Sequence, residues 1–170
     1  MRNILAACAL LASSVSAADF RVVNFGDSCD SIRPLEKALG SREASWPGLS
    51  SDVPAFTGRA FDREVTISYF CLRGRFAVGN YFFALQSLDD AVESLHEAYD
   101  SLNSTYGAPY TDTTPWHGAN SRFVTVAPDP SKYTAYWRGE RVNTTISLRP
   151  GSDAPGTKWK VAIAVSRTPN

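Results

Sequence analysis

Two cysteines, Cys29 and Cys71, constrain the fold of this chain more than any other feature. The third cysteine, Cys8, lies in a leader-like N-terminus, so an even number remains in the rest of the chain. Exported domains with an even cysteine count usually oxidise these residues to disulfides. We therefore predict one buried Cys29–Cys71 disulfide that ties the first helix to a distant strand. Closure of this loop is worth about 4 kcal/mol.

The first residues follow the pattern of a secretory signal peptide. Arg2 supplies a positive charge, an apolar run extends from Ile4 to Ala12, and Val15-Ser16-Ala17 forms a small-residue cleavage pattern. Cleavage after Ala18 fits nearly as well. The apolar run is too short to span a bilayer. We expect residues 1–17 to be removed and residues 18–170 to form a single secreted or periplasmic domain, with Cys8 lost in the leader rather than serving as a lipid anchor.

The overall charge argues against two classes of partner. The chain has 17 Lys and Arg residues against 17 Asp and Glu residues. A dedicated nucleic-acid binder would have a basic face, and anionic lipid would require a polybasic cluster. Two isolated histidines do not make a zinc or copper site. We expect no nucleic acid, no membrane span, no metal and no cofactor.

Two helices are predicted. The first begins near Ser28, whose side chain can cap it, and ends at Leu39 before Gly40. Its apolar face would contain Cys29, Ile32, Leu35 and Leu39. The second begins after Ser87 and ends at Gly107, with an apolar stripe at helical spacing.

The remaining pattern is that of short strands joined by turns. Residues 41–54 look like a loop, and no internal repeat is visible beyond a weak strand–helix echo. Because strands follow one another in hairpins, the pattern predicts an α+β fold: an antiparallel sheet packed on one face by two helices. The predicted strands are 19–25, 64–72, 75–83, 121–127, 132–138, 141–148 and 157–166.

Ser28 is the one candidate nucleophile. The segment Val22 to Ser28 resembles the first block of the Gly-Asp-Ser ester hydrolases. Such a serine needs a base and a group that orients it, but neither His96 nor His117 lies in the Asp-x-x-His block of that family. An ester hydrolase using Ser28 therefore stays the alternative to a helix-capping role.

Candidate binding residues are aromatic. Trp46 and Trp116 lie in loops that contain Pro and Gly, and His117 follows Trp116. Tryptophans in loops are enriched at recognition surfaces. They can equally fold back over the core, and the sequence does not distinguish these two roles.

The order of motifs resembles that of small exported bacterial α+β domains. The motifs are Phe25-Gly26-x-Ser28, Leu39-Gly40, Tyr69-x-Cys71 and Tyr106-Gly107-x-Pro109. In outline the layout is similar to the β-lactamase-inhibitor and outer-membrane-assembly lipoprotein folds. This resemblance implies a non-catalytic protein that binds another envelope or secreted protein, and it transfers no functional residue. A small ligand recognised through the sheet face or loops is an alternative to a protein partner. A secreted inhibitor or immunity protein is a further alternative.

Overall fold

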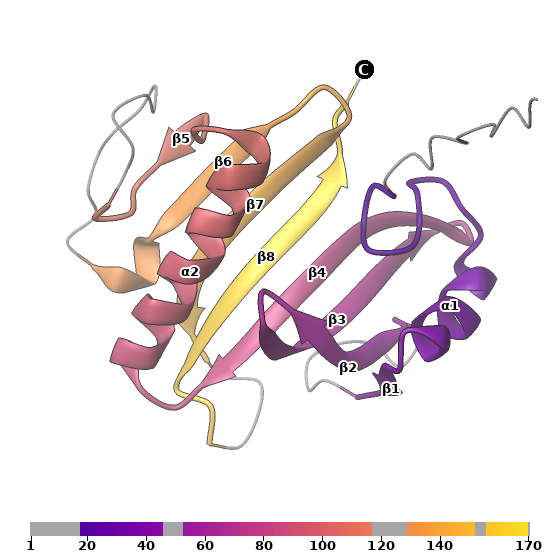
Figure 1. Cartoon of the computed structure of the whole chain (residues 1–170), viewed down its shortest axis with the longest axis horizontal. Coiled ribbons are helices and arrows are strands. Elements are labelled where there is room, and N and C mark those ends of the chain that lie inside the picture. The colour runs from indigo at the N-terminus through magenta and orange to yellow at the C-terminus, as the bar shows by residue number, and fades with distance from the viewer. Residues whose placement is uncertain (1–17, 46–52, 117–128, 152–155, 170) are drawn as a thin grey trace, which may run out of the picture.

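The computed structural model describes residues 18–45, 53–116, 129–151 and 156–169 (Figure 1). The predicted signal peptide, Trp46, His117 and the predicted strand 121–127 lie outside these residues. The elements are η1 (Cys29–Ser31), α1 (Ile32–Ala38), β1 (Arg42–Glu43), β2 (Ala55–Ala60), β3 (Arg63–Leu72), β4 (Arg75–Leu85), α2 (Leu88–Tyr106), β5 (Thr111–Asp112), η2 (Pro130–Lys132), β6 (Thr134–Arg138), β7 (Val142–Pro150) and β8 (Trp159–Arg167).

The strands form one antiparallel sheet in the order β1-β2-β3-β4-β8-β7-β6-β5. This confirms the α+β class and the antiparallel hairpins. The ends of β3, β4, β7 and β8 lie within two residues of the prediction, which is the usual uncertainty of strand boundaries. The prediction missed β2 and the two-residue strands β1 and β5, because segments with so few apolar residues give no clear alternation.

From each edge of the sheet the strands follow one another in chain order toward the centre, β1 to β4 from one edge and β5 to β8 from the other. Among the described residues a helix precedes four strands in each half of the chain, and the last strand of each half, β4 or β8, lies at the centre of the sheet. These two strands pair over eight residues. The chain therefore contains a repeat that its sequence does not reveal, because the two halves share a topology and not a residue pattern.

One face of the sheet, here called the inner face, forms the core. Its residues lie opposite one another on adjacent strands, as Phe56 does with Ile67 and Ile163 with Ile146. Most of them are completely or almost completely buried. The inner face comprises Phe56, Val65, Ile67, Tyr69, Gly79, Tyr81, Phe83, Ala135, Trp137, Thr144, Ile146, Leu148, Val161, Ile163 and Val165.

Helix α2 contacts β7 and β8 and lies across them (Figure 1). The Ser87 side chain accepts a hydrogen bond from the Asp90 N–H at its start, and Gly107 ends it with φ +76°, as predicted. The rings of Tyr99 and Trp137 lie 5.4 Å apart. Trp137 Nε1 also donates to the carbonyl of Gly107 at 2.8 Å. The C-terminal half of the helix is thus attached to β6.

The predicted strand 19–25 is wrong. Phe20 and Val23 instead pair through two backbone hydrogen bonds, of 3.0 and 2.9 Å, around a tight turn. Arg21 sits in this turn with φ +49°. The turn places both apolar side chains in the core, and the Phe20 ring lies 5.2 Å from that of Tyr69. Alternation could not reveal this arrangement, because the two buried residues are three positions apart.

The predicted apolar face of the first helix is also wrong. After the 3-10 turn η1, helix α1 buries Ile32 and Glu36, whereas Leu35 is 38 % exposed and Leu39 is 53 % exposed. The start at Ile32 leaves Pro34 in the first turn, where proline is tolerated. The helix is oriented so that Glu36 is completely buried, and this orientation exposes Leu35 and Leu39.

The structure contains the predicted Cys29–Cys71 disulfide, with α-carbons 6.4 Å apart. The prediction that it is buried is wrong, since Cys29 is half-buried and Cys71 is exposed. The register between β3 and β4 shifts between Phe70 and Cys71, so the alternation that buries Tyr69 does not continue to Cys71. The bond therefore joins η1 to β3 at the surface.

Candidate functional site

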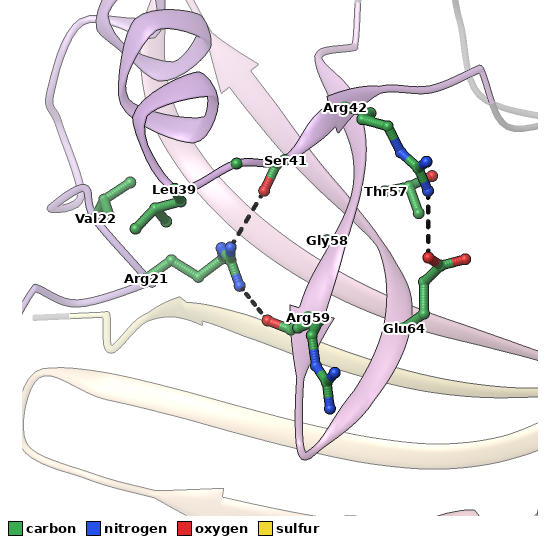
Figure 2. Close-up of a pocket in the computed structure, with 10 residues that line it drawn as sticks. Arg21, Val22, Leu39, Ser41, Arg42, Thr57, Gly58, Arg59 and Glu64 are labelled. Carbon is green, nitrogen blue, oxygen red and sulfur yellow. Dashed lines mark hydrogen bonds and ion pairs between the residues drawn. The ribbon is translucent and has the colours of Figure 1, made fainter.

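A pocket of about 650 Å³ lies beside β2, where the N-terminal turn and the segment after α1 meet it (Figure 2). Three arginines, Arg21, Arg42 and Arg59, contribute to its lining. Arginine clusters are common where carboxylate or phosphate groups bind. The pocket was not predicted, because its residues come from four segments with no shared motif.

Arg21 reaches into this pocket from its left-handed turn. Its Nη1 donates to the backbone carbonyl of Arg59 at 2.9 Å, and its Nη2 lies 3.5 Å from Ser41 Oγ (Figure 2). Gly58 permits this approach, because a Cβ there would lie 2.7 Å from Ser41 Oγ. The Arg21 side chain thus joins the N-terminal turn to β2.

Glu36 is the buried partner of Arg21. Arg21 Nε lies 2.7 Å from Glu36 Oε1, and the Tyr69 hydroxyl donates to the same carboxylate. Burial lowers the pKa of Arg21, but the hydrogen bond and the negative charge of Glu36 outweigh this and raise it. Burial, the hydrogen bond to Glu36 and its charge all raise the pKa of the Tyr69 phenol. Burial likewise raises the pKa of Tyr81, against the opposing charge of Arg21.

The other two arginines do not converge on the pocket. Arg42 points toward Glu64 and lies 3.3 Å from its carboxylate, and both side chains are largely exposed (Figure 2). Arg59 extends away from Arg21, and its Nη2 donates to the carbonyl of Asp62 at 3.0 Å. The pocket is therefore primarily a structural junction, in which Arg21 and Glu36 hold the N-terminal turn, α1 and β2 together.

The opposite face of the sheet has a different composition. Two complete rows of paired residues cross six strands there, and we call them the open face. All their members except Phe82 and Tyr136 are Ala, Ser, Thr or Asn. The first row is Thr57, Thr66, Phe82, Ala162, Ser147 and Thr134; the second is Ala55, Ser68, Asn80, Ala164, Thr145 and Tyr136.

Positive charge lies at one end of the open face. Arg149 and Lys160 pair directly across β7 and β8, two residues beyond the first row and on the same face. Lys132 of η2 joins them around a second pocket of about 520 Å³. We call Lys132, Arg149 and Lys160 the basic corner. The candidate functional site of this fold is the open face with its basic corner.

Comparison with protein-family models, with curated proteins and with solved structures found no match to this chain. In the described ranges no helix is long and apolar enough to cross a membrane. Residues 18–45, 53–116, 129–151 and 156–169 also contain no group of three or more His, Cys, Asp or Glu that could hold a metal ion.

Of the predicted binding residues, only Trp116 is among the described residues. It is half-buried, with its ring 4.5 Å from that of His96 and 6.2 Å from that of Tyr133. Its indole thus covers one side of α2, as in the alternative where it folds back over the core. Its role in binding stays a prediction, as do those of Trp46 and His117.

Ser28 occupies a capping position. Its Oγ accepts a hydrogen bond from the Asp30 N–H at 3.4 Å, and its backbone forms a bridge with Arg75. His96 instead lies on α2, with its Nε2 3.6 Å from Asp100 Oδ2 and its ring tilted against that of Trp116. The described contacts of Ser28 are those of a helix cap.

Proposed function

We propose that this protein is an exported, non-catalytic binding protein that docks an acidic partner protein on the open face of its sheet. The single observation that carries the proposal is the composition of that face. An uncovered antiparallel face usually carries a mixture of charged and polar side chains. Here its two central rows are small or aromatic. Lys132, Arg149 and Lys160 gather at one end of the face, and the exposed Arg138 lies at the other end.

We infer further that α1 and α2 cover the same face of the sheet, as the sequence predicted. Three sheet residues support this inference: Tyr69 binds Glu36 of α1, whereas Trp137 and Arg63 contact Tyr99 and Glu97 of α2. By strand register all three lie on the inner face. Among the described residues no helix then covers the open face. Four members of its rows, Ala55, Ser68, Asn80 and Ser147, are themselves buried, so a partner would contact the remaining members.

The chemistry of the partner follows from charge and shape. Small side chains allow another backbone or side chain to approach the strands closely. Arg149 and Lys160 would favour carboxylates at one end of the contact and would speed association with an acidic surface. The partner is thus a protein with an acidic segment beside a protruding apolar one.

Photo-crosslinking tests this proposal. Benzoylphenylalanine in place of Thr145 reports on the centre of the open face, and the same group in place of the exposed Glu93 on α2 is the control. We expect a discrete adduct from position 145 only, linked to an acidic peptide of the partner and lost with Arg149→Glu. Identical adducts from both positions, or an adduct that Arg149→Glu leaves unchanged, would overturn the proposal.

Export and the absence of catalysis are tested separately. The mature protein should begin at Ala18 or Asp19, which mass spectrometry of the secreted chain would show. An uncleaved, cytoplasmic chain would contradict export. Hydrolysis of a short acyl ester that disappears with Ser28→Ala would contradict the non-catalytic role.

A further inference from the structure

One end of the open face is apolar. Phe70 and Val78 pair across β3 and β4, next to the second row and on the same face, and Leu72 is the following residue of β3 on that face. Leu72 is 67 % exposed and Phe70 is 39 % exposed. We call Phe70, Leu72 and Val78 the apolar corner, and we propose that it receives an apolar segment of the acidic partner. This inference deepens the proposed function and rests on it for the class of the partner.

The first argument is that the three side chains have no place in the core. None of them is part of the buried cluster or one of the half-buried residues that pack against it. Isolated exposed apolar side chains are common on protein surfaces. These three are neighbours, however, because two are cross-strand partners and the third lies two residues along the same strand. A partner that covers them would remove contiguous apolar surface from water, which favours association.

The second argument is that the tip of the β3–β4 hairpin is held in place. The disulfide joins Cys71 to Cys29. The Cys29 N–H donates to the carbonyl of Gly74 at 3.0 Å, and the Phe76 N–H donates to the carbonyl of Asp27 at 2.9 Å. A surface that is already ordered loses little conformational entropy when it binds. The surface disulfide therefore has a role here, since it fixes the strand end that carries Leu72.

The charge of the open face indicates which protein carries the apolar segment. Glu64 is the one carboxylate that the described strands place on this face, and it pairs with Arg42. Arg73 and Arg75 border Leu72 at the hairpin tip, and both are exposed. The occupant is therefore an apolar segment flanked by carboxylates. The basic residues that the strands place on the open face are Arg42, Arg59, Arg75, Arg138, Arg149 and Lys160.

The spacing of the two corners fits one interface. Ser166, the cross-strand partner of Val78, lies six residues beyond Lys160 on β8, which corresponds to about 20 Å along the strand. A standard protein interface covers about 800 Å² on each partner, or a patch roughly 30 Å across. One partner can thus contact the basic corner and the apolar corner together.

Photo-crosslinking in the cells that export the full chain tests the apolar corner. Benzoylphenylalanine in place of Leu72 should give an adduct with the same protein that position 145 captures, through a different and apolar peptide that adjoins the acidic one. The same group in place of Leu39, an exposed leucine at the end of α1, is the control and should give no such adduct. An adduct with lipid or with unrelated proteins, or no adduct from position 72, would overturn the proposal.

The contribution of the apolar corner to binding is measured by the yield of the position-145 adduct. Leu72→Gln should lower this yield about tenfold, because an apolar side chain of this size no longer enters the interface. Leu39→Gln is the matched control and should leave the yield unchanged. Both leucines are exposed, so both variants should keep the melting temperature of the parent protein. An equal loss of yield in the two variants would contradict the apolar corner.

The apolar corner and the docking surface fail in different ways. A position-145 adduct that Leu72→Gln leaves unchanged rejects the apolar corner alone. An adduct from position 72 without one from position 145 rejects docking across the open face and leaves the apolar corner as a separate contact.

Discussion

Arg21 and Glu36 form an ion pair in which the Glu36 side chain is completely buried and the Arg21 side chain is only 11 % exposed. The pair connects a turn at residues 20–23 to α1, and Tyr69 connects both to the sheet. Because a buried carboxylate is stable only with strong donors, these residues hold the N-terminal third of the molecule in place.

Replacement of Arg21 should therefore lower the free energy of unfolding substantially. Arg21→Ala leaves Glu36 buried with Tyr69 as its described donor, and we expect the free energy of unfolding in urea to fall by about 3–5 kcal/mol. The control is Arg42→Ala, whose ion pair with Glu64 is largely exposed and should be worth less than about 1 kcal/mol. Equal losses in the two variants would contradict a structural role for the buried pair.

The stability of the fold should fall at alkaline pH. The pKa values of Tyr69 and Tyr81 are raised in the folded state, primarily by burial, whereas an unfolded phenol titrates near about 10. Above that pH the unfolded chain loses protons that the folded chain keeps. The free energy of unfolding should then drop by up to about 1.4 kcal/mol per pH unit for each tyrosine.

Urea unfolding between pH 8 and 11 measures this dependence. Tyr69→Phe should flatten the decline, and Tyr106→Phe, at an exposed position, should not. An unchanged slope in Tyr69→Phe would show that other groups cause the alkaline loss.

Reduction of the disulfide should occur without denaturant. Cys71 is exposed, so a phosphine reductant can reach the bond in the folded protein. The bond closes a loop of 42 residues, and its loss should lower the free energy of unfolding by about 4 kcal/mol in the loop-closure account. Alkylation followed by mass spectrometry gives the extent of reduction. Thiols that become reactive only in urea would contradict an accessible bond.

Gly79 should not tolerate a side chain. A Cβ at this position would lie 2.5 Å from the Phe20 ring, and Gly79→Ala should cost about 1–3 kcal/mol of unfolding free energy through overpacking. Phe20→Leu combined with Gly79→Ala should cost less than the sum of the two single variants, since the smaller leucine side chain leaves room for the methyl group. If the losses of unfolding free energy in the two single variants simply add up in the double variant, the two residues do not contact each other.

Local sequence signals were sufficient for some elements of this fold. Helix α2 begins after Ser87 and ends at Gly107 because its cap, its stripe and its stop lie within one continuous segment. The β3–β4 hairpin formed as predicted around Arg73 and Gly74, both with positive φ. The first helix was predicted less well, since Glu36 is buried by partners 15 and 33 residues away.

The candidate site was less accessible to prediction. Arg149 and Lys160 come together through strand pairing, and no motif marks either residue in the sequence. The tryptophans stood out as residue types, yet Trp116 is half-buried against His96. Residue type alone does not say which face of a sheet a side chain occupies.

By itself the sequence determined the Cys29–Cys71 pair, the hairpins and the long helix, because each follows from cysteine count, alternation or capping within short segments. The tertiary structure alone decided that this disulfide lies at the surface, that Arg21 meets Glu36, and that three cations gather at one end of the open face. These features depend on strand order and register. Contacts between distant segments set both, and no local pattern encodes them.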